Sequence, residues 1–135
     1  TGRDGSKSLK INGTPTANDY VFTTNSHAGL PTTYTKIQFY VKGTAAKSLS
    51  LNVYKTGGTA FYAFNVEGLT ANKMITVSPT NQYVGEINTN NQWVLVTLDL
   101  TGITDLNTSG TGNFFALKVG SNSAYDLQLD NFTIE

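Results

Sequence analysis

Aromatic and amide side chains recur at alternate positions of several apolar segments, a spacing that can bring them onto one surface. Asn52 and Tyr54 share one parity of their segment, and Phe114 and Lys118 share one parity of another. Aromatic faces stack on apolar C–H surfaces, while amides and ammonium groups donate hydrogen bonds. This combination favours recognition of a hydroxyl-rich ligand. The candidate binding residues are Asn52, Tyr54, Tyr62, Trp93, Phe114 and Lys118.

Groups that could do catalysis are sparse. The only histidine, His27, lies in a loop with no nucleophile-elbow sequence beside it, and the chain has no cysteine. A glycosidase needs two carboxylates facing one groove. The 9 acidic residues fall mostly in turns or at strand ends, and no pair stands out. The sequence therefore predicts no catalytic residue, and an enzyme is the least favoured interpretation.

Composition restricts the partners. The 135 residues match the size of one domain, which we place at 1–135. Nine basic and nine acidic residues give a formal net charge of zero, so no basic stripe is available to neutralise phosphates. No polybasic patch, amphipathic helix or long apolar run favours a membrane. We expect neither nucleic acid nor a membrane as a partner.

The elements that must position these residues are strands. Apolar residues alternate with polar ones along most of the chain, and turns rich in Gly, Asn, Ser and Thr separate the segments. The pattern predicts an all-β fold, a two-sheet antiparallel β-sandwich of the jelly-roll kind. The expected strands are 8–11, 20–23, 37–42, 49–54, 60–66, 73–78, 93–100, 113–119 and 125–134. The expected core is Ile37, Phe39, Val41, Leu49, Leu51, Val53, Val94, Val96, Leu98, Phe115, Leu117 and Val119.

Four segments, in order, resemble bacterial jelly-roll carbohydrate-binding modules of families four, sixteen and twenty-two and their unclassified relatives. They are Gly5–Ile11 (GSKSLKI), Lys36–Gly43 (KIQFYVKG), Gln92–Thr97 (QWVLVT) and Tyr125–Phe132 (YDLQLDNF). The resemblance covers nearly the whole chain, although the acidic segment that usually precedes the opening strand is missing. In such modules a tryptophan at the position of Trp93 often closes the end of the core.

The resemblance also implies a structural calcium between the opening turn and the closing strand. The matching positions are Asp4, Asp130 and backbone carbonyls near Arg3 and Ser6. Calcium takes several oxygen ligands from carboxylates, carbonyls and water, which these positions can supply.

We therefore expect a non-catalytic module that binds a plant or microbial polysaccharide. Zero net charge favours a neutral glycan such as xylan, β-glucan or mannan. The resemblance further implies a monomer, covalently attached to a glycoside hydrolase or other catalytic domain in an extracellular or cell-surface bacterial protein. The alternatives are a structural or adhesion β-sandwich of a bacterial surface protein and a small jelly-roll enzyme. Parity alone leaves open whether the ligand meets a sheet face or a loop edge near Tyr34, Tyr83 or Trp93.

Overall fold

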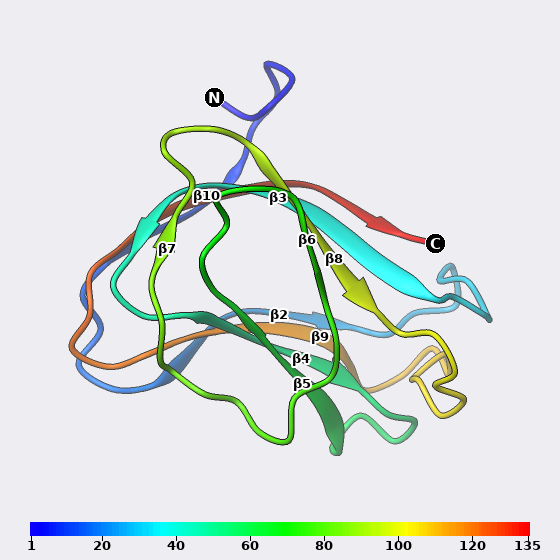
Figure 1. Cartoon of the computed structure of the whole chain (residues 1–135). Helices are drawn as coiled ribbons and strands as arrows, with labels where there is room; N and C mark the ends of the chain where they lie inside the picture. The colour runs from blue at the N-terminus through cyan, green and yellow to red at the C-terminus, as the bar shows by residue number, and fades with distance from the viewer.

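The computed structural model describes residues 1–135 as two β-sheets packed face to face, shown as the upper and lower layers of Figure 1. The first sheet has the order β1 (Leu9–Gly13), β10 (Tyr125–Ile134), β3 (Lys36–Ala45), β8 (Val94–Asp99) and β6 (Lys73–Ile75), and β7 (Ile87–Asn88) also pairs with β3. The second sheet has the order β2 (Asp19–Asn25), β9 (Asn113–Val119), β4 (Leu49–Tyr54) and β5 (Phe61–Val66).

The connectivity is that of a jelly roll, as predicted. The chain passes from β1 in the first sheet to β2 in the second, back to β3, and then to β4 and β5. The return path through β8, β9 and β10 inserts each strand beside an earlier one, so that β10 lies between β1 and β3. All pairs between these strands are antiparallel.

The core lies between the sheets and follows the predicted alternation. All twelve residues expected to point inward are less than 5% exposed. Burying the apolar face of a strand fixes its register, because a shift of one residue would move that whole face into water. The amphipathic pattern of β3, β4, β8 and β9 therefore specifies how the two layers stack.

The segment between β5 and β8 departs from the expectation. A strand is predicted over 73–78, but β6 ends at Ile75 and pairs in parallel with β8. The short strand β7, which is not predicted, then pairs with the end of β3. Residues 78–83, between these strands, follow a different course that shapes the second sheet's outer face. No helix in the fold has the length and apolar character needed to cross a membrane.

Candidate functional site

Residues 78–83, here called the strap, cross the outer face of the second sheet (Figure 1). Ser78 forms a β-bridge with Ala63 of the edge strand β5. The chain then runs over the outer face toward the middle of the sheet, where Asn81 Nδ2 donates to the Leu51 carbonyl of β4. Side chains of the sheet hold the strap by its backbone. Ser50 Oγ donates to the Gln82 carbonyl at 2.6 Å, and Asn65 Nδ2 donates to the Thr80 carbonyl at 3.0 Å. The strap therefore leaves only part of this face open.

The open part holds a lysine surrounded by aromatic rings, here called the Lys118 cluster (Tyr20, Phe61, Tyr83 and Lys118). Lys118 Nζ lies 4.9 Å from the centroid of the Tyr20 ring, 5.8 Å from that of Phe61 and 5.9 Å from that of Tyr83. It also donates to Asn81 Oδ1 of the strap at 3.0 Å. Tyr20 is 48% exposed and Phe61 is 37% exposed, so the rings present accessible aromatic surface.

The Lys118 cluster is positioned by the pairing of β2, β9 and β4 and by a close contact between Tyr83 and Gly120. Tyr20 on β2 and Ser50 on β4 both pair with Lys118 on the strand between them, so these side chains share the outer face. Tyr83 comes from the strap and packs on Gly120, where an added Cβ would lie 2.9 Å from the Tyr83 Cβ. The Lys118 ammonium group forms no ion pair with a carboxylate. The single ion pair of the molecule joins Lys36 and Glu135.

Asn52 and Tyr54, expected on an exposed face, point outward but are buried beneath the cluster. Tyr54 is 4% exposed and packs edge-on against Phe61, with ring centroids 5.7 Å apart. Asn52 is fully buried and donates from Nδ2 to the Tyr54 hydroxyl at 3.2 Å. Burial is the main cause that raises the pKa of Tyr54 above its usual value of 10.0. The expectation of exposure is wrong here because the strap and the rings above cover both residues.

Tyr62 and Phe114 lie on the opposite side of the sheet from the expected face. Tyr62 pairs with the inward residue Val53 and packs against the core, while its hydroxyl donates to Asp105. Phe114 falls at a β-bulge, because Thr24 pairs with Phe115 but the next residue of β2 pairs with Asn113. A bulge adds one residue to a strand and breaks the alternation. Phe114 consequently joins Phe115 in the core.

Trp93 stands apart from the other candidates. It is half-buried, immediately before β8 in the first sheet, with Lys42 Nζ lying 5.7 Å from its ring centroid. Of the six predicted binding residues, the structure brings Lys118, Asn52 and Tyr54 together, with only Lys118 accessible. The accessible rings of the cluster are Tyr20, Phe61 and Tyr83. None of them is among the six predicted binding residues, although Tyr83 is named for the alternative site at a loop edge.

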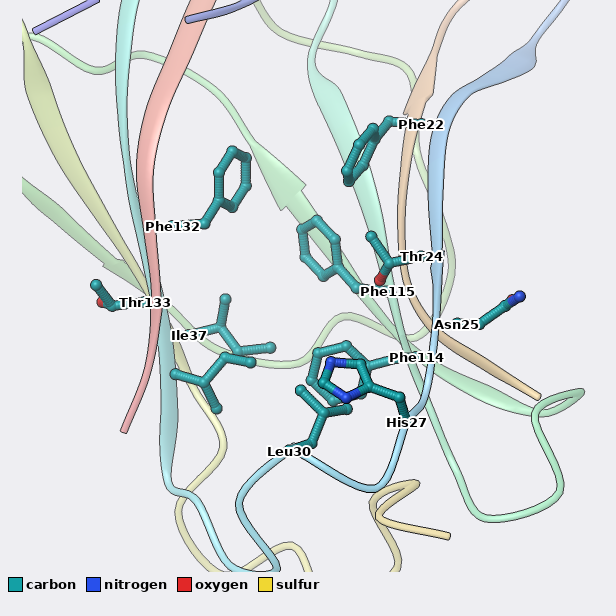
Figure 2. Close-up of a pocket in the computed structure, with 11 residues that line it drawn as sticks. Phe22, Thr24, Asn25, His27, Leu30, Ile37, Phe114, Phe115, Phe132 and Thr133 are labelled. Carbon is teal, nitrogen blue, oxygen red and sulfur yellow. The ribbon is translucent and has the colours of Figure 1, made fainter. Parts of the chain in front are cut away.

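A second feature is an apolar cleft between the open edges of the two sheets (Figure 2). It has a volume of about 400 Å³ and is lined by 11 residues, 7 of them hydrophobic. Phe132 of β10 and Ile37 of β3 face Phe22 and Phe115 of the second sheet across the cleft. His27, from the loop that follows β2, lies at its mouth.

A third feature is a group of oxygens where the N-terminal turn meets β10. An added Cβ on the buried Gly2 would clash with Asp130 Oδ2 and lie 2.9 Å from the carbonyl oxygens of Ser6 and Lys7. These three oxygens therefore surround one small volume. Asn131 Nδ2 donates to Asp4 at 3.3 Å, and the buried Asn131 Oδ1 has no hydrogen-bond partner.

This oxygen group contains most of the predicted calcium positions. Asp4 accepts a hydrogen bond from Ser6 Oγ at 2.6 Å, and this bond is the main cause that lowers the pKa of the Asp4 carboxyl below its usual value. Arg3, whose carbonyl was predicted as a ligand, instead donates its backbone N–H to Asp130 Oδ2 at 2.8 Å, and its guanidinium carbon lies 3.8 Å from the Tyr40 ring centroid. No group of three or more His, Cys, Asp or Glu side chains gathers anywhere in the molecule. Backbone and amide oxygens would therefore have to supply the remaining ligands.

Comparison with protein-family models and with curated proteins finds no match to this sequence.

Proposed function

We propose that the molecule is a non-catalytic module that binds a neutral polysaccharide at the Lys118 cluster. The observation that carries this proposal is the set of three aromatic rings within 6 Å of one lysine ammonium group on an open sheet face. Sugar rings stack their C–H faces on aromatic side chains, and their hydroxyl groups accept hydrogen bonds from amines and amides. The module would hold an attached catalytic domain on its polymeric substrate.

The form of the surface agrees with a polymeric ligand. The cluster lies on a sheet face bordered by the strap rather than in one of the molecule's pockets, so a long chain can lie across it. The rings are already fixed by β2, β5 and the Gly120 contact, which limits the entropy lost on binding. Because Lys118 is the cluster's one charged group, a neutral glycan fits better than a polyanion, which would need several cations.

The test is affinity electrophoresis of the parent protein, Tyr20→Ala and Phe61→Ala in gels containing xylan, β-glucan or mannan. We expect at least one polymer to retard the parent. Each substitution should weaken binding about fivefold, because an aromatic contact contributes roughly 1 kcal/mol. Lys118→Met keeps the apolar stem but removes the donor, and should weaken binding roughly two- to tenfold.

Tyr40→Ala is the matched control, since Tyr40 is an aromatic residue on the outer face of the first sheet. It should be retarded as strongly as the parent. Equal retardation of the parent and all three cluster variants would place the glycan elsewhere. If no polymer on a broad panel retards the parent, the polysaccharide proposal fails and a structural or adhesion module replaces it.

We also propose that the oxygen group around Gly2 holds a structural calcium ion. Asp130 Oδ2 and the carbonyls of Ser6 and Lys7 already converge on one volume, and Asp4 and Asn131 Oδ1 lie in the same turn–strand junction. Calcium accepts such a mixed oxygen set. The ion would tie the N-terminal turn to β10 and would take no part in glycan chemistry.

Calcium should raise the melting temperature of metal-stripped protein, because an ion that binds only the folded state stabilises it by about 2.7 kcal/mol at one hundred times its Kd. Asp130→Ala should abolish this rise. Gly2→Ala, which keeps both carboxylates but fills the volume between the oxygens, should also abolish it. An unchanged melting temperature in protein shown by elemental analysis to be metal-free would refute the site.

A further inference from the structure

The apolar cleft is open because β10 extends beyond its neighbour. β1 covers β10 only from Tyr125 to Leu129, so the last residues of β10 form the edge of the first sheet. The register of β10 against β3 also shifts between Asp130 and Thr133, where Asn131 has a φ of 55°. This bulge adds a residue to the strand and directs Phe132 toward the space between the sheets (Figure 2).

Phe132 forms one wall of the cleft without closing it. Its ring stacks on Phe39 at a centroid distance of 5.2 Å and on Phe22 at 6.4 Å, and it meets Phe115 edge-on at 6.1 Å. Despite these contacts Phe132 is 40% exposed. Its aromatic surface is therefore held in a fixed position and remains available to a ligand.

The lining restricts the chemistry of that ligand. Phenylalanine, isoleucine and leucine predominate, and His27 is the one residue of the lining that can carry a charge. A charged ligand would lose its hydration with little compensation. Ligand sites are commonly apolar cavities of this size with a few oriented polar groups. At roughly 30 Å³ for each water-sized group, the cleft holds about a dozen non-hydrogen atoms.

His27 supplies the oriented polar group. Its Nδ1 accepts a hydrogen bond from the Gly29 N–H at 3.0 Å. The neutral ring consequently carries its proton on Nε2, which donates to no group of the protein. A ligand in the cleft can satisfy this donor with an acceptor oxygen at the mouth, while its body contacts the phenylalanine rings behind.

We propose that the apolar cleft binds a small neutral aromatic molecule carrying a hydrogen-bond acceptor oxygen. The aromatic ring packs among Phe22, Phe115 and Phe132, and the oxygen accepts from His27 Nε2. This site is separate from the Lys118 cluster, since the two share no residue. The inference is therefore independent of the polysaccharide proposal.

Acetophenone is the probe, followed by saturation-transfer NMR and by titration of backbone amide shifts in the full chain. We expect saturation of its ring protons, a dissociation constant on the order of 1 mM, and shifts confined to residues lining the cleft. Cyclohexyl methyl ketone, which keeps the oxygen but lacks the aromatic ring, should bind more weakly.

Two variants separate the parts of the site. His27→Phe keeps a ring but removes the donor, and should weaken acetophenone binding roughly two- to tenfold while leaving ethylbenzene binding unchanged. Phe132→Leu should weaken both ligands, and the partial exposure of Phe132 makes this change tolerable to the fold. Tyr20→Ala, in the Lys118 cluster, should bind acetophenone like the parent.

The proposal is overturned if acetophenone shows no saturation transfer with the parent, or if the shifts gather at Tyr20, Phe61 and Lys118. Equal binding of acetophenone and the saturated ketone would refute the aromatic preference. Unchanged affinity in His27→Phe would refute the hydrogen bond from Nε2.

Discussion

Strands β3 and β4 have the same alternating sequence pattern but differ in how their outer faces are covered. On β3 the inward residues are buried while Gln38, Tyr40 and Lys42 remain half-buried. On β4 all six residues are buried. The difference comes from the strap, which crosses β4 and is hydrogen-bonded to it, and from the Phe61 ring, which packs on Tyr54. Alternation therefore identifies which residues face outward, but a distant segment decides whether they meet solvent.

Truncating a core side chain should destabilise the protein similarly on the inner faces of β3 and β4. These substitutions should give the largest losses in the free energy of unfolding. Leu51→Ala on β4 and Phe39→Ala on β3 each remove a side chain that is fully buried. Such substitutions cost the transfer free energy plus that of the cavity, so we expect losses of about 3 kcal/mol for Leu51→Ala and about 4 kcal/mol for Phe39→Ala. Urea denaturation measures both. A loss under 1 kcal/mol at either site would contradict a shared core.

Removing a polar side chain should cost more stability on the outer face of the second sheet, where the strap lies, than on the outer face of β3. Asn65 Oδ1 accepts from the Gln82 N–H at 2.8 Å, and Asn65 Nδ2 donates to the Thr80 carbonyl at 3.0 Å. Asn65→Ala should lower the free energy of unfolding by about 2 kcal/mol, because it removes the two hydrogen bonds that hold the strap backbone to β5.

Gln38→Ala is the control on the outer face of β3, where Gln38 Nε2 donates to Thr97 Oγ1. It should cost about 0.5 kcal/mol, the lower end for one hydrogen bond. Hydrogen exchange adds a second measurement, since amides of β4 should exchange faster in Asn65→Ala but not in Gln38→Ala. Equal effects of the two substitutions would show that the strap does not protect β4.

The smallest expected change in stability is at Tyr34, a buried tyrosine that is not covered by the strap. Burial raises the pKa of Tyr34 from 10.0 to about 12, and its hydroxyl has no hydrogen-bond partner. The folded state therefore resists ionisation, so the associated stability is present below pH 10 and is lost as the pH rises toward 12.

Tyr34→Phe should leave the free energy of unfolding unchanged within about 0.5 kcal/mol at pH 7, because no hydrogen bond is lost. Above pH 10 the variant should lose less stability than the parent. Some alkaline loss should remain, since burial also raises the pKa of Tyr54 and Tyr125. Denaturation midpoints measured from pH 7 to 11 test this, and parallel curves for parent and variant would contradict it.

The sequence predicts the fold well because a sandwich depends on a simple repeated property. Residues such as Phe39 and Leu51 alternate with polar neighbours, and burying one face of each strand is enough to place them. The two-layer arrangement and the core therefore follow from local pattern. The parallel pairing of β6 does not, because its three residues are too few to show a period.

The candidate site was harder to predict because it depends on contacts between distant segments. Tyr83 reaches Lys118 through the strap, whose sequence has no periodicity and whose course is set by hydrogen bonds from Ser50 and Asn65. The bulge that turns Phe114 inward changes the alternation in a way that composition does not reveal. Phe61 and Tyr62 are neighbours on one strand, so their side chains point to opposite faces. The sequence prediction names Tyr62, but Phe61 is the ring that pairs with Tyr54 on the outer face.

The position of β10 has a consequence for the kinetics of folding. This strand is made after all the others, yet it lies between β1 and β3 and pairs Leu9 with Leu129 and Val41 with Leu129. Until it is synthesised, β1 has no hydrogen-bonded neighbour and the first sheet is divided. Pairings this distant along the chain are slow to form and leave strand edges exposed meanwhile. A ribosome-bound chain that ends before residue 125 should therefore remain sensitive to protease and available to chaperones.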